Sequence, residues 1–82
     1  MHVSHTQLSL FSTSHCHLCD LALTLINNTL PNVKLQVVEI SDNIELMRQY
    51  ELLIPVLQNQ QTKDVLYWPF TAEDILQLTN TK

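Results

Sequence analysis

The sequence predicts a single α/β domain in which a four-stranded mixed sheet carries helices on both faces. Strand-like and helix-like segments alternate along the 82 residues, and a short polar turn separates the last two strand-like segments. The length is that of one domain, which we place over residues 1–82. The expected order is β-α-β-α-β-β-α, and its first three elements form a right-handed parallel unit.

The first strand and the first helix follow clear patterns. Residues 7–12 favour a strand that stops at a Ser-Thr-Ser run. A helix is expected from about Cys16, and Asn27 and Asn28 are expected to end it because asparagine tolerates the left-handed conformation. Within this helix, apolar residues recur at the spacing of one helical face. They are Leu18, Leu21, Ala22, Leu25 and Ile26.

The middle of the chain predicts a buried strand and a short helix. Residues 33–40 are rich in Val, Ile and Leu, which is typical of a strand covered on both faces. Asp42 and Glu45 have the spacing of a capping box. The helix that they would begin places Ile44 and Met47 in the core.

The last third predicts a hairpin and a final helix. Residues 54–58 and 65–68 are the two strands, and residues 59–64 form the polar turn between them. Thr71 and Asp74 have the spacing of a helix start. The apolar residues of this helix are Ile75, Leu76 and Leu78.

The composition excludes several classes of partner. The net charge is −4, with four Lys and Arg residues against eight Asp and Glu. Because phosphate binding needs clustered cations, the scattered cations argue against nucleic acid and anionic membrane surfaces. The chain has no glycine, which excludes Gly-rich phosphate loops. Residues 1–10 lack a signal-peptide pattern, and the longest apolar stretch, residues 52–57, is too short to span a bilayer, so we expect a cytoplasmic location.

Cys16 and Cys19 form a C-x-x-C pair at the expected junction of the first strand and the first helix. In a chain expected to be cytoplasmic, this spacing indicates a redox pair or half of a metal site. Free backbone N–H groups and the helix dipole favour the thiolate form of Cys16, and Cys19 lies one turn later on the same face. We therefore predict a reversible disulfide in which Cys16 attacks and Cys19 resolves.

Three segments resemble the bacterial glutaredoxin-like proteins, a group with the thioredoxin fold. Residues 10–20 contain the motif C-H-L-C-D, and residues 50–57 end in Ile-Pro-Val-Leu, which is similar to the cis-proline strand of that family. The likeness continues through residues 67–70, so the segments together cover nearly the whole chain. The resemblance implies a thioredoxin-like fold of the glutaredoxin type and a thiol–disulfide oxidoreductase activity.

The resemblance also implies a place for the substrate. A cis Ile54–Pro55 bond would lie opposite the first cysteine, and the residue before the proline would offer backbone groups to an extended substrate. Taken alone, Pro55 could equally begin an edge strand. His15 and His17 are candidate substrate-site residues because a protonated imidazole there would stabilise the thiolate, although two solvated loop histidines fit the same pattern.

Glutathione is the small-molecule substrate that the resemblance raises, and no bound cofactor is expected. Glutaredoxins proper carry a lysine shortly before the first cysteine and a Gly-Gly pair after the fourth strand, and this chain has neither. Glu51 also stands where relatives often have glycine. The two carboxylates of glutathione need cations or free N–H groups. Arg48 and the N–H groups around Thr71 are the candidates, so we predict a Kd of about a millimolar or weaker.

Two further interpretations concern the remaining histidines and the aromatic residues. His15, Cys16, His17 and Cys19 are the candidate metal ligands, but structural zinc usually takes its four ligands from two separated pairs. No second pair follows, and His2 and His5 lie at the far end of the first strand, so we predict no metal. Tyr67, Trp68 and Phe70 are expected to pack under the last helix, with a docking patch beside the active site as the alternative.

Two classes of function therefore remain. The first is an oxidoreductase whose partner is a protein or a small-molecule thiol or disulfide. The second is a protein-binding module of thioredoxin fold whose cysteines are incidental. We expect a monomer.

Overall fold

The computed structural model describes residues 7–79 and has the predicted order of elements, with one added 3₁₀ turn. The elements are β1 (Gln7–Ser12), α1 (His17–Thr29), β2 (Lys34–Glu39), η1 (Ile40–Asp42), α2 (Ile44–Tyr50), β3 (Val56–Asn59), β4 (Val65–Tyr67) and α3 (Ala72–Thr79). Among these residues, no helix has the length and apolar character needed to cross a membrane.

The four strands form one mixed sheet in the order β2-β1-β3-β4. β1 runs parallel to β2 and pairs Ser12 with Glu39, and it runs antiparallel to β3 and pairs Phe11 with Val56. β4 completes the hairpin at the other edge. The end of β1 therefore lies between the end of β2 and the beginning of β3.

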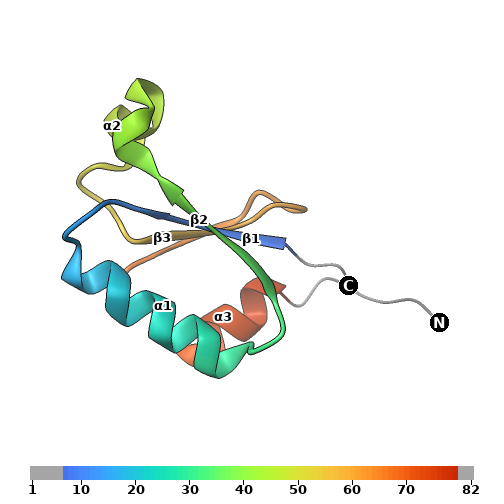
Figure 1. Cartoon of the computed structure of the whole chain (residues 1–82). Helices are drawn as coiled ribbons and strands as arrows, with labels where there is room; N and C mark the ends of the chain where they lie inside the picture. Colours follow the sequence, from blue (N-terminus) through green and yellow to red (C-terminus); the bar gives the residue numbers. More distant parts are fainter. Residues whose placement is uncertain (1–6, 80–82) are drawn as a thin grey trace.

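The two faces of this sheet are covered very differently (Figure 1). α1 and α3 lie on one face, which we call the α1–α3 face, and α2 stands on the other side, beyond the end of β2. The alternation of side chains along the strands sends Leu8, Leu10 and Leu57 to the α1–α3 face and Phe11 and Val56 to the α2 face. Helices thus lie on both faces, as predicted.

The expected burial of β2 is wrong, and that of the apolar face of α1 is confirmed only in part. β2 was expected to be buried, but it is an edge strand and most of its side chains are exposed or half-exposed. Its apolar composition cannot reveal its place in the sheet. Of the predicted apolar face of α1, Ala22 and Ile26 are buried and Leu25 packs against the core. Leu18 and Leu21, at the start of the same face, are exposed.

Helix ends also differ from the expectations. α1 continues through Asn27 and Asn28 and ends at Thr29, with Leu30 as its C-cap, whose N–H donates to the Ile26 carbonyl. α2 begins with Asn43 as its cap, since the Asn43 side chain accepts from the Leu46 N–H.

The capping box predicted at Asp42 is therefore wrong, and Asp42 belongs to η1. Ile44, expected in the core, is 70% exposed because α2 is short and touches the sheet with its other side. Met47 does pack against the core on the α2 face.

The last third matches the sequence pattern more closely. Thr71 and Asp74 form the predicted reciprocal cap of α3. The Thr71 N–H donates to the Asp74 carboxylate, and the Asp74 N–H donates to the Thr71 hydroxyl oxygen. Phe70 is buried and Trp68 packs edge-on against it, with ring centroids 5.1 Å apart. Tyr67 is exposed, so the aromatic cluster is core only in part.

Candidate redox site

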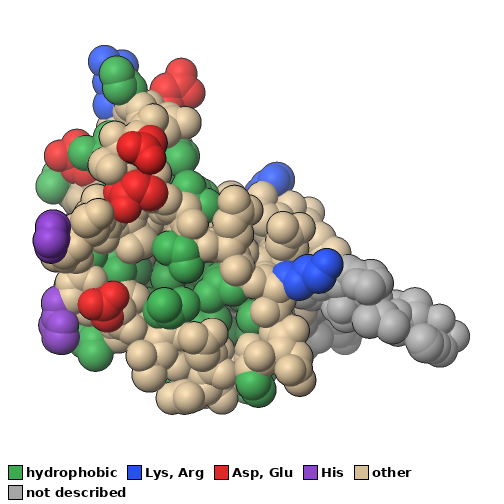
Figure 2. Space-filling model, in the orientation of Figure 1, with side chains coloured by type: hydrophobic (Ala, Val, Ile, Leu, Met, Phe, Trp, Pro, Cys, Tyr) green, Lys and Arg blue, Asp and Glu red, His purple; other side chains and the backbone are tan. Residues whose placement is uncertain are grey.

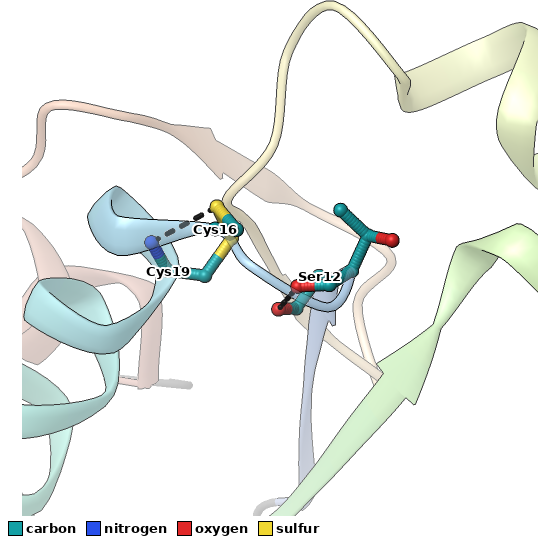
Figure 3. Close-up of a disulfide and its surroundings, with 4 residues drawn as sticks. Ser12, Cys16 and Cys19 are labelled. Atoms are coloured by element: carbon teal, nitrogen blue, oxygen red, sulfur yellow. Dashed lines mark hydrogen bonds between the residues drawn. A yellow bond between two sulfur atoms is a disulfide. The ribbon is translucent and has the colours of Figure 1, made fainter.

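Cys16 and Cys19 lie at the start of α1 and are joined by a disulfide, with their Cα atoms 5.2 Å apart (Figure 3). Cys16 is the N-cap of the helix, and its Sγ accepts a hydrogen bond of 3.1 Å from the Cys19 N–H. A sulfur therefore takes the place of the oxygen that usually caps a helix start. Cys16 is half-buried, whereas Cys19 is 4% exposed. The outer position thus belongs to Cys16.

A tight loop between β1 and α1 sets the position of Cys16. His15, directly before it, has a left-handed backbone with φ of 63°. Histidine is among the few residues other than glycine that occupy this region with some frequency, which suits a chain without glycine. At the other end of the loop, the Ser12 hydroxyl donates to the Thr13 carbonyl over 3.4 Å.

Glu39 connects this loop to the neighbouring strand. Its carboxylate accepts from both the N–H and the hydroxyl of Ser41, at 3.2 and 2.7 Å. Ser41, followed by the Thr13 hydroxyl and then that of Ser14, lowers the pKa of Glu39 below its ordinary value. Because Ser12 and Glu39 are paired in parallel strands, a carboxylate at the end of β2 faces the loop that leads to Cys16.

The connection between α2 and β3 passes beside the cysteines, as Figures 1 and 3 both show. It contains the Ile54–Pro55 bond, which is cis as the resemblance implied. Pro55 is fully buried and Ile54 packs against the core on the α2 face. The Trp68–Pro69 bond is also cis, which nothing in the sequence indicated.

An aromatic stack belongs to the cluster against which Ile54 of this connection packs. Phe11 and Tyr50 lie face to face, with ring centroids 4.7 Å apart. Phe11 precedes Cys16 by five residues, and Tyr50 precedes Pro55 by five residues. Burial raises the pKa of Tyr50, and the nearby Tyr67 adds to that rise. The residue before Pro55 therefore packs against an uncharged aromatic pair.

The other predicted site residues are His15, His17 and Thr71. His15 and His17 flank Cys16, and both side chains are exposed. Thr71 caps α3: its N–H donates to the Asp74 carboxylate, and its hydroxyl oxygen accepts from the Asp74 N–H. Within residues 7–79, no three His, Cys, Asp or Glu side chains gather as they would around a metal ion. His2 and His5 lie outside the described residues.

Sequence reasoning missed three features of this site. Glu39 was not singled out, although its place at the end of an expected strand parallel to the first would have put it near the cysteine loop. The capping role of the Cys16 sulfur was not foreseen either. Leu52 was treated only as part of an apolar run, yet it is 91% exposed.

Comparison with known proteins places this chain in a family. Residues 7–78 match the model of a glutaredoxin-like domain, DUF836. The chain belongs to this glutaredoxin-like domain family. A search of curated proteins finds no match.

Solved structures agree with that assignment. Protein XcR50 from X. campestris is 32% identical and superimposes with a TM-score of 0.75 for its X-ray structure, over 83% of this chain and 88% of that one. Its solution structure gives a TM-score of 0.72, at 32% identity over 83% and 85% of the two chains. Protein Ne2328 from Nitrosomonas europaea, 22% identical, covers 94% of both chains with a TM-score of 0.80, which supports the fold alone. The fold is of the thioredoxin type.

Proposed function

We propose that this glutaredoxin-like protein is a thiol–disulfide oxidoreductase that works through Cys16 and Cys19. The observation that carries the proposal is the disulfide between a half-buried N-cap cysteine and a buried cysteine one turn later. When the disulfide is reduced, the same N-cap position supports a thiolate on Cys16, because the Cys19 N–H and the positive end of α1 both point at the sulfur. Cys19, shielded from solvent, is suited to the second step.

The proposed reaction transfers two electrons from the dithiol to a substrate disulfide. The Cys16 thiolate attacks one substrate sulfur, which forms a mixed disulfide and releases the other sulfur as a thiolate that takes up a proton. Cys19 then gives up its proton and attacks the Cys16 sulfur, so that the Cys16–Cys19 disulfide forms and the second substrate thiol leaves. The reverse sequence oxidises a substrate dithiol.

Mass spectrometry of the reduced protein after mild oxidation tests this proposal. We expect a monomer that has lost two hydrogen atoms, and alkylation near neutral pH should label Cys16 before Cys19. In a Cys19→Ser variant the mixed disulfide should accumulate, whereas a Cys16→Ser variant should form none. Persistent free thiols, or intermolecular disulfides alone, would contradict the proposal. If a Cys16→Ser/Cys19→Ser variant bound its partner unchanged, the protein would instead be a binding module.

A further inference from the structure

Two leucines are exposed in the connection between α2 and β3. Leu52 is 91% exposed and Leu53 is 44% exposed, and both lie in the connection that passes the cysteines. Leu18, inside the C-x-x-C motif itself, is 45% exposed. A single exposed leucine is ordinary, but here both segments next to the disulfide carry exposed leucines, which favours an interaction site.

Acidic side chains border the same surface. Asp20 follows Cys19, Glu51 precedes the two leucines, and Glu39 faces the loop before Cys16. Figure 2 shows Asp and Glu side chains on both sides of the two described histidines, which are the neighbours of Cys16. We call Leu18, Leu52 and Leu53 with Asp20, Glu39 and Glu51 the redox rim.

Two of the three described cations lie far from the redox rim, and the third, Arg48, precedes Glu51 of the rim by three residues. Lys34 pairs with Gln7 at the first position of β1, and Lys63 lies in the hairpin turn beside Asn59, which pairs with Leu8. Five steps along β1 separate this end of the sheet from Ser12, which is about 17 Å. Arg48 is exposed on α2, and Figure 2 shows Lys and Arg side chains at the tip of that helix and at the opposite end of the sheet.

We propose that the substrate is a disulfide in a protein segment that carries apolar residues and Lys or Arg next to its cysteines. This inference rests on the proposed redox function and names its substrate class. Apolar side chains of the segment would cover Leu52 and Leu53, and its cations would face the carboxylates of the rim. Glutathione has the opposite character, since it is small and anionic, and the Thr71 N–H already donates to the Asp74 carboxylate.

Matched peptides provide the test. The pre-reduced full chain is mixed with short synthetic peptides that are each closed by one disulfide, and the single-turnover rate of their reduction is measured. One peptide carries Leu and Lys beside its cysteines, a second has Glu in place of Lys, and a third has Ser in place of Leu. Oxidised glutathione is the fourth substrate. We expect the Leu–Lys peptide to react about tenfold faster than the Leu–Glu peptide at low salt, and this ratio to approach one at high salt.

Two pairs of variants assign the effect to the rim. Asp20→Asn with Glu51→Gln should remove most of the preference for Lys over Glu, while Asp64→Asn, in the hairpin turn, should leave it intact. Leu52→Ser with Leu53→Ser should slow the Leu–Lys peptide about tenfold and leave the Leu-free peptide unchanged, because partial burial of a leucine changes a binding constant by about that factor. Leu76→Ser, at a leucine of α3 that is 50% exposed, is the control.

The outcomes separate the substrate class from the redox function. Equal rates for the Lys and Glu peptides, or faster reduction of glutathione, would overturn the proposed substrate class and leave the redox function standing. Failure of every substrate to react with a dithiol that does form under mild reduction would count against the proposed function itself. Light scattering that showed a dimer lost on Leu52→Ser would assign the leucines to a second copy of this chain and overturn the docking proposal.

Discussion

The two faces of the sheet have different tasks, and their packing shows it. The α1–α3 face buries eight residues in one cluster, whereas the α2 face buries four. Most of the apolar area removed from water, and hence most of the hydrophobic stabilisation, therefore belongs to the α1–α3 face. The α2 face instead holds up the connection with Leu52, Leu53 and Pro55 beside the disulfide. The cluster on the α1–α3 face therefore provides most of the stability, and the smaller cluster on the α2 face holds the connection that passes the disulfide.

Three isoleucines provide the largest test of this comparison. Ile26 is fully buried on the α1–α3 face, Ile40 is fully buried on the α2 face, and Ile44 is 70% exposed. We expect Ile26→Ala to lower the free energy of unfolding by about 4 kcal/mol and Ile40→Ala by about 2 kcal/mol, because the smaller cluster can collapse more easily around a cavity. Ile44→Ala should cost less than about 0.5 kcal/mol. Urea denaturation measures all three, and equal costs for the two buried residues would refute the comparison.

Asn59 extends the test to a buried polar group. Its amide donates to the Leu78 carbonyl at 2.9 Å and its oxygen accepts from the Gln61 and Thr62 N–H groups, so that it joins the hairpin turn to the end of α3. Asn59→Ala should cost about 2–3 kcal/mol because the buried Leu78 carbonyl would lose its partner and the turn would lose two further hydrogen bonds. Gln58→Ala, on the other side of the same strand, should cost less than about 0.5 kcal/mol. Thermal unfolding of both variants would show this ordering, or its absence.

The cap of α3 should have a smaller effect. Thr71→Ala removes the hydroxyl that accepts from the Asp74 N–H, which should cost about 1 kcal/mol. Thr24→Ala, at an exposed position inside α1, should be neutral or slightly stabilising, since alanine is the better helix former. Chemical denaturation of the two threonine variants compares a capping residue with an interior one. A neutral Thr71→Ala would mean that α3 is held by its packing alone.

Glu39 gives the smallest effect, and it depends on pH. Because the pKa of Glu39 is lowered in the folded state, its carboxylate stabilises the protein above the ordinary value of 4.5, and this contribution is lost as the pH falls through the folded value. The stability difference between the native chain and Glu39→Gln should thus be constant near neutral pH and shrink in acid. Glu45→Gln, exposed on α2, controls for the change in net charge. A difference that did not vary with pH would show that the carboxylate charge has no part in holding the loop.

What the sequence determined by itself was local. The β-α-β-α-β-β-α order, the Thr71–Asp74 cap and the C-x-x-C pair at a strand–helix junction follow from periodicity, capping chemistry and spacing, which act over a few residues. Only the tertiary structure decided which apolar segments are covered, because burial depends on what packs against a segment. It made β2 an edge strand and left Leu18 and Leu52 exposed beside the disulfide. It also brought Glu39 to the cysteine loop, since parallel strands end at the same edge of a sheet.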